Sequence, residues 1–105
     1  MNTLMKLNIN NNISELIRQH INLFNSFDNV YLFGSVLDIS KTPNDIDILL
    51  IYSEYTSKIN NDVSLICSVL EKVSGLSVDV TVLSIEEEKD TEFLKKINSL
   101  YLKLK

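Results

Sequence analysis

The stretch Leu32–Ser53, LFGSVLDISKTPNDIDILLIYS, joins a Gly-Ser pair to a run of apolar residues that begins with two aspartates. Asp45 and Asp47 are one residue apart and stand immediately before Ile48–Ile51. A carboxylate beside a buried strand is unfavourable unless something pairs with it. The two aspartates therefore either cap a turn after Asn44 or bind a ligand.

The run Asp45–Tyr52 is predicted to form a strand. Side chains alternate between the two faces of a strand, so Asp45 and Asp47 share one face. Apolar residues then follow on both faces, namely Ile46, Ile48 and Leu50 on one and Leu49 and Ile51 on the other. A strand that is apolar on both faces lies in the middle of a sheet. We therefore expect the two carboxylates at one end of a central strand, where a cleft can open.

A third acid, Asp79, lies in the next predicted strand, Leu76–Leu83, on the face that also carries Ser77 and Thr81. If this strand lies beside the previous one, its carboxylate joins the other two. Oxygen ligands without nearby Cys or His favour a hard cation such as Mg²⁺ or Mn²⁺. The pattern therefore predicts a metal site formed by Asp45, Asp47 and Asp79, which suits metal-assisted phosphoryl or nucleotidyl transfer.

A Gly-Ser pair ends the preceding predicted strand, Val30–Phe33. Glycine lets the backbone approach a phosphate closely, and free N–H groups with a serine hydroxyl can hold its oxygens. Alone, such a pair is more often a plain turn. Placed at a strand end before the Asp-x-Asp motif, Gly34 and Ser35 are predicted to bind phosphate.

The other predicted elements are three helices. The first begins at Asn12, the second spans about Ser57–Ser74, and the third opens with a capping box of Ser84 and Glu87. The third helix is expected to bury Phe93, Leu94, Ile97, Leu100, Tyr101 and Leu104. Residues 38–45, DISKTPND, are predicted to be a loop. The element order is α-β-β-α-β-α, which predicts an α+β, two-layer fold in which helices pack on a mixed sheet with a three-strand core.

Composition limits the class of protein. The 105 residues suffice for one compact domain, expected over residues 1–105, and 45% hydrophobic residues can form a core. The net charge of −4 is the wrong sign for sequence-independent nucleic-acid binding. The sequence has neither a run of about 20 apolar residues nor a secretory signal, so we expect a soluble cytoplasmic protein without membrane contact.

The motif FGS, nine intervening residues and DID, with VDV on a later strand, resembles the DNA polymerase beta-type nucleotidyltransferase superfamily. More narrowly, it is similar to the minimal nucleotidyltransferase (MNT) domains of that superfamily. The resemblance covers about Val30–Leu83, and the order of elements matches the family's fold over nearly the whole chain. It therefore implies the small nucleotidyltransferase fold.

The resemblance also assigns roles to the residues of the motif. It implies that Gly34 and Ser35 grip the triphosphate of ATP and that Asp45 and Asp47 bind Mg²⁺ or Mn²⁺. Asp79 would complete the site and help to deprotonate the acceptor hydroxyl.

The loop after the Gly-Ser pair departs from the family pattern. It is one residue shorter than the usual form, and it lacks the Gly and Arg that many members carry. Lys41 is its one cation. The charge of the triphosphate would therefore rest on the metal ions, the backbone and Lys41.

MNT proteins are often antitoxins paired with an HEPN-domain ribonuclease toxin, and some transfer AMP to a tyrosine of that toxin. The resemblance thus implies AMP transfer from ATP to an HEPN-type partner. Two alternatives stay open: an MNT-like antitoxin with weak or no activity that acts by binding alone, and a nucleotidyltransferase that modifies a small molecule such as an antibiotic. The lack of an acceptor domain after Asp79 counts against the small-molecule alternative. The sequence leaves open whether the chain forms a homo-oligomer.

Overall fold

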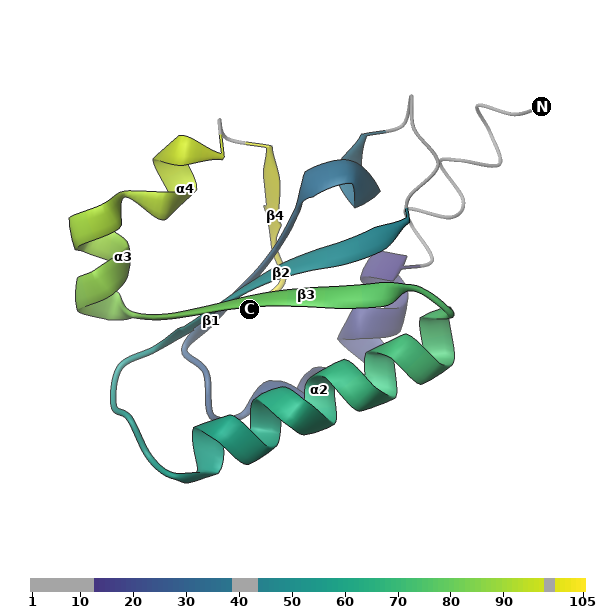
Figure 1. The fold of residues 1–105 in the computed structure, drawn as a ribbon, viewed down its shortest axis with the longest axis horizontal. Coiled ribbons are helices and arrows are strands. Elements are labelled where there is room, and N and C mark those ends of the chain that lie inside the picture. Colours follow the sequence, from purple (N-terminus) through teal and green to yellow (C-terminus); the bar gives the residue numbers. More distant parts are fainter. Residues whose placement is uncertain (1–12, 39–43, 98–99) are drawn as a thin grey trace.

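The computed structural model describes residues 13–38, 44–97 and 100–105. In these ranges four strands form one sheet in the order β3-β2-β1-β4 (Figure 1). The strands are β1 Asn29–Phe33, β2 Asp45–Tyr52, β3 Ser77–Ser84 and β4 Tyr101–Lys103. β1 is antiparallel to β2 and β4, whereas β2 and β3 are parallel. β2 is therefore an interior strand, as its apolar run predicts.

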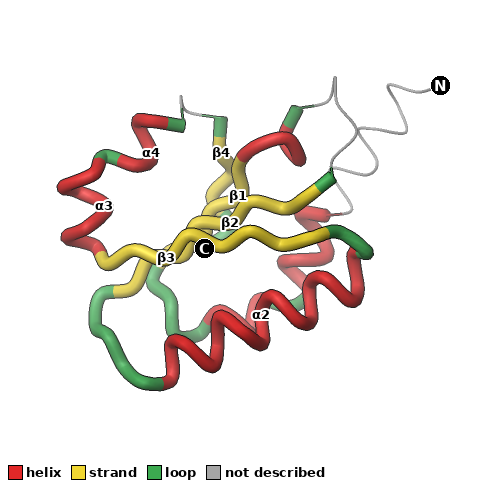
Figure 2. The backbone as a smooth tube through the Cα atoms, viewed as in Figure 1, coloured by secondary structure: helices red, strands yellow, loops and turns green. Residues whose placement is uncertain are grey.

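Helices cover both sides of the sheet. Residues 13–19 are helical and lead into the 3-10 helix η1, Ile21–Phe24. The longest helix, α2, spans Lys58–Ser74 and lies on the side of the sheet opposite to α3, Ile85–Thr91, and α4, Phe93–Lys96 (Figures 1 and 2). The predicted α+β fold, with helices packed on a mixed sheet, is confirmed. The expected first residue of the N-terminal helix, Asn12, lies outside the described residues.

The main core lies between the sheet and α2. It is built from alternate residues of the strands and from one stripe of each helix on that side, and its members include Ile17, Phe24, Val30, Leu32, Ile46, Ile48, Leu50, Ile66 and Leu70. Alternation directs the intervening strand residues to the opposite face. The acidic residues of β2 and β3 therefore point away from this core.

The crossover from β2 to β3 determines where β3 lies. Two parallel neighbours cannot be joined by a tight hairpin, and the connection here is α2. Gly75 ends this helix in the left-handed conformation, with φ 75°, and its N–H donates to the carbonyl of Glu71. The predicted helix Ser57–Ser74 and its glycine stop are thus confirmed to within one residue.

The prediction of one long C-terminal helix is wrong. Its capping box is present, since Ser84 Oγ accepts from the Glu87 N–H, but α3 ends at Thr91 and Glu92 adopts φ 50°. After the single turn of α4, the chain forms β4 on the outer edge of β1. The sequence LYLKLK at 100–105 fits the helical period and also the two-residue period of a strand, because its leucines alternate with Tyr101 and Lys103. The open edge of β1 offers backbone partners, and this tertiary contact favours the strand.

Proline substitutions in β4 test this correction. Leu102 is the partner of Leu32, and the N–H of Leu104 donates to Val30 O, so even-numbered residues of β4 face β1. Leu102→Pro removes a ladder donor and is expected to lower the free energy of unfolding by about 3 kcal/mol. Lys103→Pro, whose N–H points outward, should lower it much less. Equal losses in urea denaturation would contradict the strand.

In the described part of the chain, no helix is long and apolar enough to cross a membrane.

Candidate active site

The acidic side chains of β2 and β3 converge at one end of the sheet. Asp47 and Asp79 are direct partners in the parallel pairing, and Asp45 lies two residues before Asp47 on the same face. One carboxylate oxygen from each of Asp45, Asp47 and Asp79 lies within 4.8 Å of the others. Strand alternation predicted this convergence, provided that β3 lay beside β2.

Glycine is required at position 34 for two reasons. Gly34 has φ 82°, a left-handed conformation that side chains with a Cβ rarely adopt. A Cβ at this position would also overlap the Asp47 carboxylate, at 3.0 Å from Asp47 Cγ. The backbone of the turn that follows β1 therefore packs directly against one of the three acids.

Ser35 links the Gly-Ser turn to the same acids. The turn opens the 3-10 helix η2, Gly34–Leu37, immediately after β1. Ser35 Oγ donates a long hydrogen bond of 3.4 Å to Asp45 Oδ1. The two motifs that the sequence separates by nine residues are thus one site in space.

Burial and like charge act on Asp47 in the same direction. Desolvation is the main cause that raises the pKa of Asp47, and the neighbouring charges of Asp45 and Asp79 raise it further. A divalent cation between the three carboxylates would relieve this repulsion. Three carboxylate groups without His or Cys form the oxygen donor set that suits Mg²⁺ or Mn²⁺.

A pocket of about 320 Å³ adjoins the Gly-Ser turn. Its lining residues are Phe33, Gly34, Ser35, Asp38, Ile97 and Leu100. Phe33 is the β1 partner of Asp47, and its ring meets Phe93 edge to face at 5.6 Å. This volume is at the lower end of the range for small-molecule sites.

Three apolar residues of this pocket were not predicted from the sequence. Ile97 and Leu100 were expected on the buried side of a helix, and Phe33 was expected only to end a strand. No spacing in the sequence indicates that Ile97 and Leu100, which follow α4, line a pocket with η2, because their position depends on the break at Glu92. Lys41, the expected cation of the loop, lies outside the described residues.

The comparison with protein families decides the family of this chain. The family model of the nucleotidyltransferase domain matches residues 16–103, which include the Gly-Ser turn and all three acids. This chain belongs to the nucleotidyltransferase domain family. A search of curated proteins found no match.

Solved structures share the fold of this nucleotidyltransferase domain. A toxin–antitoxin complex with AMP-PNP gives a TM-score of 0.60 at 19% identity, over 90% of this chain and 73% of the other. A candidate nucleotidyltransferase from Sulfolobus solfataricus gives a TM-score of 0.56 at 20% identity, over 98% of this chain and 86% of the other. A complex of a tri-AMPylated HEPN toxin with an MNT antitoxin from Shewanella oneidensis gives a TM-score of 0.53 at 18% identity, over 88% of this chain and 71% of the other. At these identities the likeness establishes the fold.

Proposed function

We propose that this nucleotidyltransferase domain transfers AMP from ATP to a tyrosine hydroxyl of an HEPN-type partner protein. The observation that carries the proposal is the meeting of three carboxylates within 4.8 Å beside the Gly-Ser turn. We further propose that residues 1–105 act as a single MNT domain, in the cytoplasm, where ATP is available.

Each residue of the site has a proposed role. Gly34 and Ser35 hold the triphosphate, with Lys41 as an additional cation. Asp45, Asp47 and Asp79 hold Mg²⁺ or Mn²⁺. Such ions would neutralise phosphate charge and stabilise the charge that develops in an in-line displacement.

The order of the strands fits the direction of such a displacement. The Gly-Ser turn follows β1, Asp45 and Asp47 belong to β2, and Asp79 belongs to β3, so Asp79 lies on the far side of β2 from the turn. The acceptor oxygen forms a bond to the α-phosphorus while the bond to the pyrophosphate oxygen breaks. Pyrophosphate leaves on the side of Gly34 and Ser35, and the hydroxyl proton passes to the carboxylate of Asp79.

The choice of partner rests on the proteins that share the fold. One of these structures contains an AMPylated HEPN toxin with an MNT antitoxin, and another is a toxin–antitoxin complex with AMP-PNP. The first supports transfer of AMP to an HEPN-type acceptor by this chain, and the second supports an ATP-like nucleotide.

The test is to incubate the chain with ATP, Mg²⁺ and an HEPN-type protein from the same genome, and to measure the intact mass of that protein. We expect the mass to increase by AMP, and Asp45→Asn to slow this transfer by about 10²-fold or more. The exposed Glu86 provides a control of equal charge change, and Glu86→Gln should retain the rate. Neutralisation of the toxin without AMP transfer, unaffected by Asp45→Asn, would contradict the proposal and support binding alone.

A further inference from the structure

We propose that the acceptor segment of the partner docks as an extended strand on the open edge of β3, which brings its hydroxyl beside Asp79. This inference rests on the proposed function and adds how the acceptor is bound. The occupant is a polypeptide segment of the partner that carries the acceptor tyrosine.

β3 is an edge strand of the described sheet, and its length makes it a usable edge. It has eight residues, and its only neighbour in the strand order is β2 (Figure 1). Neither proline nor lysine, which commonly protect an edge strand from pairing, occurs in SVDVTVLS. Its one charged residue, Asp79, points into the acidic cluster.

The backbone groups that face this edge follow from the register. Val30 donates to Lys105 O and accepts from Leu104 N–H, so the even-numbered residues of β1 face β4. Backbone groups alternate in direction along each strand. Through the β1–β2 and β2–β3 registers, the N–H and C=O groups of the odd-numbered residues of β3 therefore point to β2. The N–H groups of its even-numbered residues, from Val78 to Ser84, therefore face the open edge.

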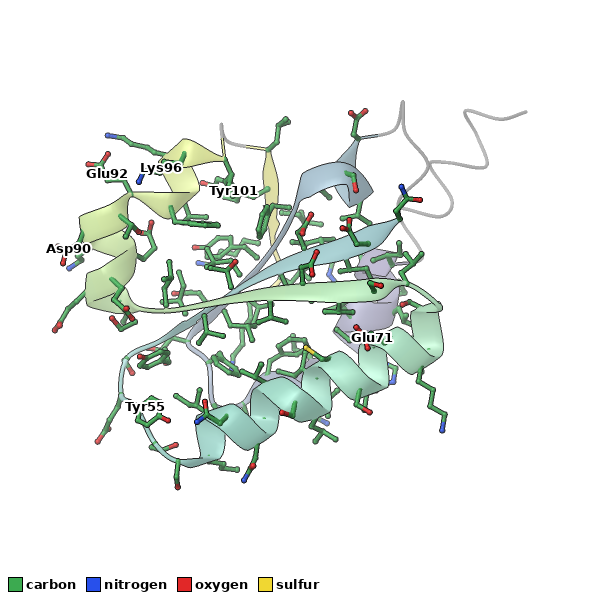
Figure 3. All side chains as sticks on the ribbon, in the orientation of Figure 1. Tyr55, Glu71, Asp90, Glu92, Lys96 and Tyr101 are labelled. Carbon is green, nitrogen blue, oxygen red and sulfur yellow. The ribbon has the colours of Figure 1, made fainter. Side chains whose placement is uncertain are left out.

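Carboxylates cap the two ends of this row of donors. The N–H of Val78 donates to Glu71 Oε2 at 3.0 Å, and Glu71 points from α2 toward β3 (Figure 3). The N–H of Ser84 donates to Glu87 Oε1 at 2.9 Å. Between them lie Val80 and Val82, whose N–H groups point away from β2 and donate to no described residue. The edge thus offers two backbone donors between two filled positions.

These two donors lie next to Asp79. In a paired strand, residues opposite each other have Cβ atoms about 4.5–5.5 Å apart on the same face, and diagonal neighbours are within reach of aromatic side chains. A tyrosine diagonal to Asp79 on an added strand would therefore reach the acidic cluster. It would approach from the side of Asp79 opposite to Gly34 and Ser35, as an in-line displacement requires.

The side chains of the edge indicate the sequence around the acceptor. Val80 and Val82 are half-buried and point toward the α2 side of the sheet. An added strand would place the residues on either side of its tyrosine over these two valines. The acceptor is therefore a tyrosine flanked by apolar residues in an extended segment.

The deciding variant is Val80→Pro, which removes one edge donor. Because this N–H faces outward, proline removes no hydrogen bond of the sheet. With Asp45 and the other acids intact, we expect transfer of AMP to the HEPN-type protein to slow by about tenfold, and the affinity for ATP with Mg²⁺ to change by less than about twofold. Lys103→Pro, which makes the same kind of change at an outward-facing N–H on the opposite edge of the sheet, is the control and should retain the rate. Unchanged transfer by a folded Val80→Pro protein would overturn the docking.

Amide hydrogen exchange separates this inference from the proposed function. On addition of the HEPN-type protein to the Asp45→Asn variant, which keeps the edge intact, the Val80 and Val82 amides should gain protection. If the partner binds and these amides stay unprotected, the docking is wrong even where AMP transfer occurs. Protection that rises with the concentration of the chain alone would instead show that a second copy occupies the edge, which also overturns the proposal. Protection in this variant, together with no AMP transfer by the wild-type chain, would support the docking and contradict the proposed function.

Discussion

Asp47→Asn is expected to abolish AMP transfer and to raise the free energy of unfolding of the metal-free protein at neutral pH. Asp47 is the acid on which burial and the charges of both other acids act together. Asparagine keeps the shape of the side chain but removes its charge. The repulsion therefore disappears together with a metal ligand, and transfer should fall by about 10²-fold or more.

The pH dependence of stability gives a second signature of Asp47. Its pKa is raised in the folded protein, so the folded state binds a proton more tightly than the unfolded state does. The stability that this group contributes is therefore present at low pH and is lost as the pH rises above 3.8, the ordinary value, through the raised pKa. In Asp47→Asn this fall should be smaller.

Urea denaturation from pH 4 to 8, in EDTA and in Mg²⁺, measures both effects. Glu54→Gln, at the exposed turn beyond the other end of β2, makes the same change of charge away from the cluster and should leave the pH profile unchanged. Mg²⁺ should stabilise the wild type more than the variant. A variant less stable than the wild type in EDTA at neutral pH would show that repulsion does not dominate at Asp47.

Gly34→Ala is expected to have the second large effect, on both stability and activity. A left-handed conformation at a residue with a Cβ costs about 1–2 kcal/mol, and the overlap with Asp47 adds about 1–3 kcal/mol of overpacking. Relief of this overlap must displace the Asp47 carboxylate. AMP transfer should therefore fall even in the fraction of protein that remains folded.

Gly75 offers a matched control for this substitution. Its φ is 75°, close to that of Gly34, but a Cβ there would meet no atom within 4 Å. Gly75→Ala should lower the free energy of unfolding by about 1–2 kcal/mol and leave AMP transfer intact. Urea denaturation and transfer rates would separate the cost of the left-handed conformation from the effect of the overlap with Asp47. Equal effects of the two alanines on transfer would contradict the contact between Gly34 and Asp47.

The acidic cluster could be predicted because it depends on alternation within strands. Asp45 and Asp47 share a face in any extended conformation, and Asp79 needed only a parallel neighbour to join them. The apolar residues on both faces of β2 indicated a central strand, and a helix of 17 residues leads to β3. Local sequence therefore contained most of the information for this end of the sheet.

The C-terminal region could not be predicted in the same way. Leu102 and Leu104 fit a helical stripe as well as an alternating strand, and only the open edge of β1 distinguishes the two. The helix breaks at Glu92 because this residue adopts a left-handed conformation, which a glutamate in the sequence does not predict. The pocket between η2 and the segment that follows α4 depends on this break, so its three apolar lining residues were missed as well.

The carboxylate caps on β3 also limit how this chain can associate with itself at high concentration. Fibrils grow when a long, flat edge offers unpaired backbone groups along its whole length. Glu71 and Glu87 occupy the donors of Val78 and Ser84, so a foreign strand finds only a short stretch with an anionic group at each end. The same edge can therefore be open enough for one brief contact and still resist the stacking of many chains.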